Sequence, residues 1–112
     1  MARNMSFALT THQFKNRTKT VTRRLGWWNL KPETVLCGVE KSMGLRKGEK
    51  ITRLGLIRVV NVRVEPLNAI TKEDCILEGF PDFLPQDFVW MFCFNNKCKP
   101  DQQVNRIEFV YL

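Results

Sequence analysis

The first 32 residues of the sequence contain no aspartate or glutamate, although seven of them are lysine or arginine. From residue 33 to the end, eleven basic residues balance eleven acidic ones. The whole formal net charge of +7 therefore comes from this acid-free segment, residues 1–32. Positive charge concentrated in one place attracts partners that carry phosphate groups. We therefore expect RNA or a nucleotide as the partner of this chain.

Other features are scarce or missing, and each absence argues against a class of protein. No apolar run approaches the roughly 18 residues of a membrane-spanning helix, and the N-terminus lacks the apolar region of a secretion signal. The four cysteines include no Cys-x-x-Cys pair, and the single histidine lies far from them in the sequence. This spacing argues against a zinc site. We expect reduced thiols, no metal or other cofactor, no membrane contact and a cytoplasmic location.

With 112 residues, of which 44% are hydrophobic and 26% charged, the chain should form one domain over residues 1–112. Hydrophobic periodicity and turn residues indicate where its elements lie. The predicted strands span 18–24, 35–39, 56–64 and 104–112, and the predicted helices span 10–16, 71–78 and 85–94. Several connections between strands are short. This favours the α+β class, as a small, mixed, mainly antiparallel β-barrel with two or three short flanking helices.

Three segments carry further expectations. In the third strand, Val60, Val62 and Val64 alternate with polar residues and should share one face. The last helix is apolar on all sides over residues 88–94, so it should be mostly buried. Residues 1–4 show no pattern of a helix or strand.

The acid-free segment contains a run that concentrates polar chemistry, Lys19-Thr20-Val21-Thr22-Arg23-Arg24. Arginine forks suit phosphate or carboxylate groups, and lysine supplies a point charge. A threonine hydroxyl can donate a hydrogen bond, or act as a nucleophile beside a base. The alternative is an edge strand whose charges only prevent aggregation. Because no acidic residue lies nearby, we favour a ligand site over a plain surface strand.

Further candidate binding residues flank this run. Trp27 and Trp28 offer aromatic faces on which unpaired bases could stack, although at least one should pack over the end of the barrel. Residues 41–53 carry a net charge of +4, and Gly44 and Gly48 indicate a mobile loop. The remaining candidates for phosphate contacts are Lys15, Arg17, Lys31, Arg46 and Lys47. Because residues 65–87 carry −5, the two basic segments would form a positive face opposite a negative one if they meet, as nucleic-acid footprints often do.

Several motifs, taken in order, resemble the ASCH domain, a small β-barrel superfamily similar to the PUA RNA-binding domain. They are Lys19-Thr20-Val21-Thr22-Arg23-Arg24, Leu30-Lys31-Pro32-Glu33, Ile57-Arg58-Val59-Val60-Asn61-Val62, Glu78-Gly79-Phe80-Pro81 and the closing Arg106-Ile107-Glu108-Phe109. The resemblance extends from about Phe7 to Leu112 and is greatest for short stand-alone ASCH proteins of bacteriophages and prophages. It implies a cleft between the barrel and its helices. One departure is Glu33-Thr34, where such proteins usually have a Gly-Asp turn.

The resemblance also implies a catalytic set. Bacterial ASCH amidohydrolases that deacylate acetylated cytidine use a lysine, a threonine three residues later and a distant glutamate, which correspond here to Lys19, Thr22 and Glu78. The threonine would attack the amide carbonyl, the lysine would act as base or stabilise charge, and the glutamate would pass the proton to the leaving amine. Lys19 would then need a lowered pKa, which crowding by Arg17 and the two arginines of the run could supply.

The set places a condition on the backbone. Residues three apart on a regular strand point to opposite faces, so Lys19 and Thr22 can share a pocket only if the strand bends or begins near Val21. Two functions remain open: binding of RNA or a nucleotide in a basic cleft, and hydrolysis of a modified nucleoside such as N4-acetylcytidine. RNA cleavage would need a lysine and a tyrosine, and Tyr111 is the only tyrosine. A module that binds a host protein is a further alternative.

Overall fold

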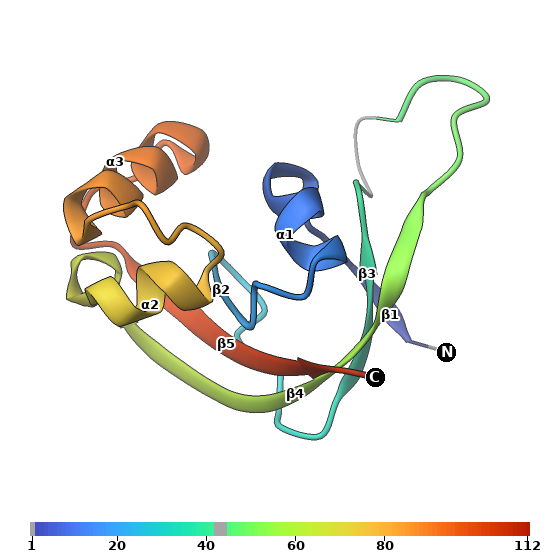
Figure 1. The fold of residues 1–112 in the computed structure, drawn as a ribbon, viewed down its shortest axis with the longest axis horizontal. Coiled ribbons are helices and arrows are strands. Elements are labelled where there is room, and N and C mark those ends of the chain that lie inside the picture. Colours follow the sequence, from blue (N-terminus) through green and yellow to red (C-terminus); the bar gives the residue numbers. More distant parts are fainter. Residues whose placement is uncertain (1, 42–44) are drawn as a thin grey trace.

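The computed structural model describes residues 2–41 and 45–112, in which a curved sheet of five strands carries short helices on its concave side (Figure 1). Side by side, the strands are β1 (Arg3–Ser6), β3 (Val35–Val39), β4 (Arg53–Pro66), β5 (Gln103–Tyr111) and β2 (Val21–Arg24). The β1–β3 pair is parallel, and the other pairs are antiparallel. The predicted α+β class and mixed sheet are confirmed. The sheet curls into a half-barrel whose edges are β1 and β2.

The alternation of β5 places its apolar residues on the concave face. Ile107 and Phe109 are buried, and Tyr111 packs partly buried against the same core. In β4, a bulge between Val59 and Asn61 shifts the pairing with β5. Val59 is fully buried, whereas Val60 lies at the bulge and is 39% exposed.

The predicted face of β4 is therefore wrong in part. Val62 and Val64 pair with Ile107 and Asn105 in one regular register beyond the bulge and so keep the predicted alternation, although Val64 is 57% exposed. Val60 lies at the bulge itself and departs from it. The alternation is broken because the bulge adds one residue to β4 that β5 does not match.

Residues 3–6 form a strand that the sequence pattern did not indicate. β1 pairs in parallel with β3, in a register that places Met5 opposite Gly38, and Met5 is buried. The turn that leads into β3 contains Glu33-Thr34, the departure from the ASCH pattern. Glu33 adopts φ +74, in the left-handed region that favours glycine, and its N–H donates to the carbonyl of Val59 at 2.8 Å.

The helices are α1 (Thr11–Lys15), α2 (Lys72–Leu77) and α3 (Pro85–Asn96), with 3₁₀ turns η1 (Ala8–Thr10) and η2 (Leu67–Ala69). α2 follows its predicted signals. The Thr71 hydroxyl accepts a hydrogen bond from the N–H of Asp74 at 3.2 Å, which caps the first turn. The helix ends at Leu77, Glu78 is its C-cap residue, and Gly79 follows with φ +97.

α3 differs from its prediction. It begins at Pro85 as expected, and Phe88 and Phe92 are buried on one side. On the opposite side, however, Trp90 and Phe94 are each 69% exposed, and their rings stack with centroids 5.3 Å apart. This helix, which is apolar all round, is therefore buried on one side only. The expectation that residues 88–94 are mostly buried is wrong for the side that carries Trp90 and Phe94.

The apolar side chains form two clusters on the concave side of the sheet. The first lies under α1 and includes Phe7, Phe14, Ile57 and Phe109. The second lies beneath α2 and α3, and its buried members are Leu67, Ile70, Cys75, Phe88, Phe92 and Val104. Figure 1 shows α1 over one part of the sheet and α2 with α3 over another. Side chains of both clusters face the space between them, which holds the candidate site.

Candidate functional site

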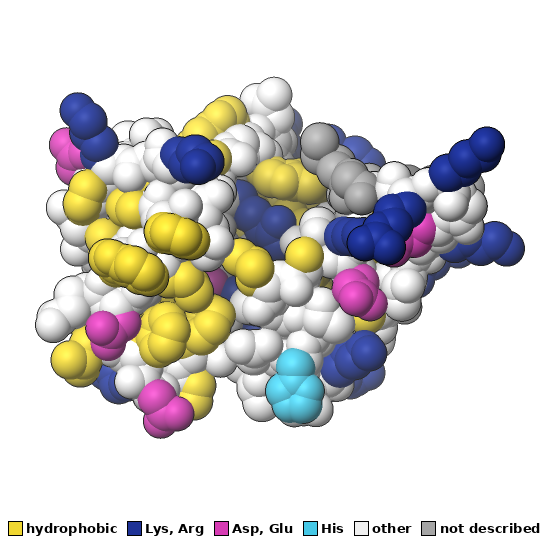
Figure 2. Space-filling model, turned by 90° about the horizontal axis from the view of Figure 1, so that it is seen from above, with side chains coloured by type: hydrophobic (Ala, Val, Ile, Leu, Met, Phe, Trp, Pro, Cys, Tyr) yellow, Lys and Arg dark blue, Asp and Glu magenta, His cyan; other side chains and the backbone are white. Residues whose placement is uncertain are grey.

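A pocket of about 350 Å³ opens between the two clusters. Figure 2 shows it as a hollow with Lys or Arg side chains in its interior and hydrophobic side chains near its rim. Its polar lining consists of Ser6, Thr10, Lys19, Thr22, Arg23, Arg24, Glu78 and Asn96. Its apolar wall includes Phe7, Leu9, Trp27, Phe80, Phe88, Met91 and Phe92. Segments far apart in the sequence therefore meet here.

The start of β2 brings Lys19 and Thr22 to the same pocket. The strand begins at Val21 and not at residue 18, so the predicted strand 18–24 is wrong over its first three residues. This later start meets the condition on the backbone. Before it, the N–H of Thr20 donates to the carbonyl of Leu77 at the end of α2, at 2.8 Å. Lys19 is thereby outside the regular strand and lines the pocket together with Thr22. Thr20 itself is half-buried and does not contribute to the lining.

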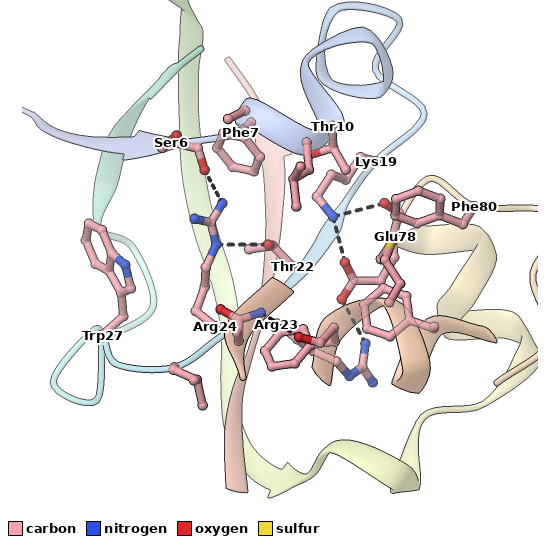
Figure 3. Close-up of a pocket in the computed structure, with 17 residues that line it drawn as sticks. Ser6, Phe7, Thr10, Lys19, Thr22, Arg23, Arg24, Trp27, Glu78 and Phe80 are labelled. Atoms are coloured by element: carbon pink, nitrogen blue, oxygen red, sulfur yellow. Dashed lines mark hydrogen bonds and ion pairs between the residues drawn. The ribbon is translucent and has the colours of Figure 1, made fainter. Parts of the chain in front are cut away.

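Lys19 and Glu78 form a buried ion pair at the end of α2 (Figure 3). The Lys19 Nζ lies 2.6 Å from the Glu78 Oε1 and also donates to the backbone carbonyl of Glu78 at 2.9 Å. Each residue is 2% exposed. A cation is favourable at this position because the carbonyl groups at the C-terminus of a helix carry partial negative charge.

The guanidinium of Arg23 donates hydrogen bonds to three carboxylates. Its Nη1 donates to the Glu78 Oε2 at 3.1 Å, and its Nη2 donates to the Asp74 Oδ2 at 2.5 Å and the Glu65 Oε2 at 3.1 Å. Arg106 holds the same Asp74 carboxylate with two donors, at 2.8 and 3.1 Å. Burial opposes the charge of Asp74, but these arginines outweigh it and lower the pKa of Asp74 to about 2.

Arg24 lies in the pocket without such a carboxylate. The ion pairs of residues 2–41 and 45–112 include none with Arg24. Its Nε donates to the Thr22 hydroxyl at 3.1 Å, its Nη2 donates to the Ser6 carbonyl at 2.5 Å, and the guanidinium lies 4.8 Å from the centre of the Phe7 ring. Burial lowers the pKa of Arg24 to about 10, although Glu78 acts in the opposite direction.

The pKa of Lys19 is lowered, as its proposed role as a base would need. Burial is the main cause, Glu78 counteracts it, and Arg24 and Arg23 lower the pKa further. The expected contribution of Arg17 is absent, because Arg17 is exposed and its guanidinium lies over the Tyr111 ring at 5.5 Å.

Tyr111 is not a partner of the Lys19 amine. Its hydroxyl donates to the Lys19 backbone carbonyl, and the residue does not contribute to the lining of the pocket. The lysine–tyrosine pair that RNA cleavage would need is therefore not assembled in this pocket.

The structure separates the predicted binding residues into two groups. Lys19, Thr22, Arg23, Arg24 and Trp27 line the pocket. The other predicted basic residues are all exposed and lie outside its lining: Lys15, Arg17, Lys31, Arg46 and Lys47. In the basic segment 41–53, which was expected to form a mobile loop, Gly44 lies outside the described residues. The pocket is therefore a compact cavity rather than a continuation of the whole basic surface.

Sequence reasoning missed several lining residues. Ser6 and Thr10 come from the N-terminal segment, and Ser6 bonds to Arg24 through its backbone carbonyl, which no side-chain pattern reveals. Asn96 comes from the last turn of α3. Phe80 belongs to the Glu78-Gly79-Phe80-Pro81 motif, and this motif was the only feature of the sequence that could have identified it as a lining residue. Phe88 and Phe92, expected in the core, belong to both the core and the wall.

Metal ligands do not gather in the part of the chain that the structure describes, where no three His, Cys, Asp or Glu side chains come together. The four cysteines are free thiols, two of them buried. None of the helices in the described ranges is long and apolar enough to cross a membrane.

Two solved structures are similar to this chain over nearly its whole length. One is the crystal structure of a protein from Enterococcus faecalis V583 in the family DUF984, with a TM-score of 0.69 and 16% identity over 100% of this chain and 77% of that one. The other is the crystal structure of an ASCH domain from Lactobacillus crispatus JV V101, with a TM-score of 0.61 and 14% identity over 97% and 78%. No protein-family model matches the sequence, and no curated protein matches it. The chain thus has an ASCH-like, PUA-like α+β fold, while kinship with phage proteins and a cytoplasmic location stay predictions.

Proposed function

We propose that the pocket binds a nucleotide, either free or as one unit of an RNA, with an anionic group on Arg24 and the base against the aromatic wall. The observation that carries this proposal is the guanidinium of Arg24, which lines the pocket but forms no ion pair among the described residues. The Nη1 of Arg24 makes none of the hydrogen bonds in the described part of the chain, so it can donate to a ligand.

The rest of the pocket supports the same proposal. Its volume of about 350 Å³ lies in the range of small-molecule sites. Three cations, Lys19, Arg23 and Arg24, face it against the single carboxylate of Glu78 among the described lining residues. Aromatic rings such as Trp27 and Phe80 offer flat apolar surfaces for a base. The ASCH-like fold is consistent with an RNA-related ligand.

Titration with cytidine monophosphate, followed by tryptophan fluorescence, tests this proposal. We expect saturable binding that Arg24→Gln weakens at least about tenfold, because a charge-assisted hydrogen bond contributes about 1.5–3 kcal/mol. Lys31→Gln is the matched control, since it removes the same charge from an exposed residue outside the lining. Equal loss in both variants, or no binding of the nucleotide and of a short single-stranded RNA, would contradict the proposal.

The salt dependence of RNA binding distinguishes contact with a single phosphate in the pocket from additional phosphate contacts by the exposed basic residues. A single phosphate held in the pocket gives a slope of log K against log salt near about −0.7, and each additional phosphate contact steepens it by a similar amount. A steep slope that Lys15, Arg17 and Lys31 variants reduce would indicate that the exposed basic residues also contact the RNA.

A second candidate function, amide hydrolysis of an acylated nucleoside, is favoured by one specific observation. Lys19, Thr22 and Glu78 line one pocket, and the pKa of Lys19 is lowered. The Thr22 oxygen accepts from Arg24, which leaves the hydroxyl proton of Thr22 free to be transferred. A threonine nucleophile needs an amine base of this kind in the same pocket.

Neutral Lys19 takes the hydroxyl proton while the Thr22 oxygen bonds to the amide carbonyl carbon. As the carbon–nitrogen bond breaks, Glu78 relays that proton from Lys19 to the leaving nitrogen, which departs as the free amine of cytidine. Water then attacks the acyl-threonine ester: its oxygen bonds to the carbonyl carbon and one of its protons goes to the Thr22 oxygen as the ester bond breaks. Acetic acid leaves and gives its proton to solvent as acetate. Arg24, which donates to the threonine oxygen, holds the nucleophile in place.

Incubation with N4-acetylcytidine, followed by chromatographic detection of cytidine, tests this second function. We expect Thr22→Ala to reduce turnover by roughly 10³-fold or more, since the nucleophile is lost. Thr22→Ser should retain part of the activity. Thr20→Ala serves as the matched control, because Thr20 lies two residues away and outside the lining. Turnover that is equal in the wild type and Thr22→Ala, or absent from both, would eliminate amide hydrolysis.

A further inference from the structure

We infer that Asp74 and Glu65, neither of which lines the pocket, are positioning residues that hold Arg23 so that Glu78 keeps one carboxylate oxygen for Lys19. Glu78 is shared between two cations. Its Oε1 accepts from Lys19 at 2.6 Å and its Oε2 accepts from Arg23 at 3.1 Å. Each oxygen of this buried carboxylate thus serves a different cation.

An unconstrained arginine would not share the carboxylate in this way. A guanidinium and a carboxylate prefer a bidentate pair, in which two N–H groups meet the two oxygens. Here only the Nη1 of Arg23 contacts Glu78, because its Nη2 is engaged by Asp74 at 2.5 Å and Glu65 at 3.1 Å. Without these two acceptors, both ends of the guanidinium can turn to Glu78 and compete with Lys19 for Oε1.

Asp74 is itself held by Arg106. The Nε and Nη2 of Arg106 donate to its two oxygens at 2.8 and 3.1 Å, and Arg106 also contacts Glu108 at 3.3 Å. The contacts form a chain from β5 through α2 to β2, of which only Lys19, Arg23 and Glu78 line the pocket.

Fastening α2 to the sheet does not by itself require this arrangement. A bidentate pair between Arg23 and Asp74 would connect β2 to α2 just as firmly, with fewer charges removed from water. In the observed arrangement, Arg23 instead donates to Glu78 on the pocket side and to Asp74 and Glu65 on the other side. This division leaves the Glu78 Oε1 available to Lys19.

The charged groups that face Lys19 are Glu78, Arg23 and Arg24. Neutralising Asp74 leaves the positive charge of Arg23 less compensated and lets Arg23 draw Glu78 away from Lys19. Both changes disfavour the protonated amine, so they lower the pKa of Lys19 further. If Lys19 is the base of the proposed hydrolysis, activity would extend to lower pH; this consequence rests on the proposed function, whereas the titration of Lys19 does not.

The test is a titration of ¹³C-labelled lysine side chains by NMR in the full chain, with the Lys19 signal assigned by its loss in Lys19→Met. We expect Asp74→Asn to lower the Lys19 pKa by about half a unit or more. Glu108→Gln is the matched control, because it also removes a carboxylate that contacts Arg106 but leaves Arg23 untouched. This control should leave the Lys19 pKa within about 0.2 units of the wild-type value.

The inference is overturned if the two variants shift Lys19 equally, if neither shifts it, if Asp74→Asn raises its pKa, or if wild-type Lys19 titrates in the ordinary lysine range. Should Asp74→Asn not fold, Glu65→Gln provides the same test, since Glu65 is the other acceptor of the Arg23 Nη2. A shifted Lys19 in a chain that does not hydrolyse N4-acetylcytidine would refute the hydrolysis and leave the positioning role standing.

Discussion

Glu78 is the only acidic side chain among the described residues that line the pocket, and it faces two buried cations, Lys19 and Arg23. Removing one partner of a buried ion pair leaves a charge without compensation. Removing Glu78 leaves the buried Lys19 without a carboxylate partner, while Arg23 keeps Asp74 and Glu65. Removing Lys19 instead leaves Glu78 still paired with Arg23.

We therefore expect Glu78→Gln to lower the free energy of unfolding by about 3 kcal/mol or more, and Lys19→Met to lower it by clearly less. Urea-induced unfolding at neutral pH measures both. A Lys19→Met variant that is destabilised as strongly as Glu78→Gln would contradict this account of the charge balance.

Single residues with a chemical requirement were also the most predictable part of the site. Lys19, Thr22 and Glu78 could be selected from motifs. The condition that two of them share a pocket allowed either a bend or a strand start near Val21, and the structure has the strand start. The contribution of Ser6 could not be predicted, because it consists of a backbone carbonyl.

At the scale of elements, predictions succeeded where a local pattern determines the structure. The cap at Thr71 and the glycine after Glu78 define α2, and the alternation of β5 defines its buried face. β1 was missed because four residues are too few to show periodicity, and because its pairing with β3 depends on residues more than thirty positions away. The exposure of Trp90 was missed for a different reason: uniform hydrophobicity does not indicate which side of a helix the core will cover.

At the scale of the whole molecule, charges that are separate in the sequence are combined in space. Glu65, Asp74 and Glu78 come from the acidic segment 65–87, and they pair with buried cations rather than forming part of a negative face. The net charge of each segment could be counted from the sequence, but this pairing could not, because it depends on how the sheet curls.

This pairing makes the stability of the fold dependent on acid pH. Burial opposes ionisation, but Arg106 and Arg23 lower the pKa of Asp74 to about 2, and the pKa of Glu65 is lowered as well. A carboxyl group with a depressed pKa stabilises the folded state above its ordinary pKa, and this contribution is lost as the pH falls toward the folded value.

We expect the free energy of unfolding to decrease as the pH falls from about 4 to about 2. Asp74→Asn should flatten this dependence, because the group that titrates is gone. Asp101→Asn, which removes an exposed carboxylate, should behave like the wild type. Urea midpoints measured across this pH range provide the comparison, and the same slope in all three proteins would refute the assignment to Asp74.

Arg24 connects the two edges of the half-barrel. It belongs to β2, one edge of the half-barrel, and it donates to the carbonyl of Ser6 in β1, the other edge. A ligand that draws the guanidinium toward itself therefore competes with a cross-link between the two edges of the sheet. For a ligand of that kind, binding and the cross-link between the two edges are thermodynamically linked, and each weakens the other by the same free energy.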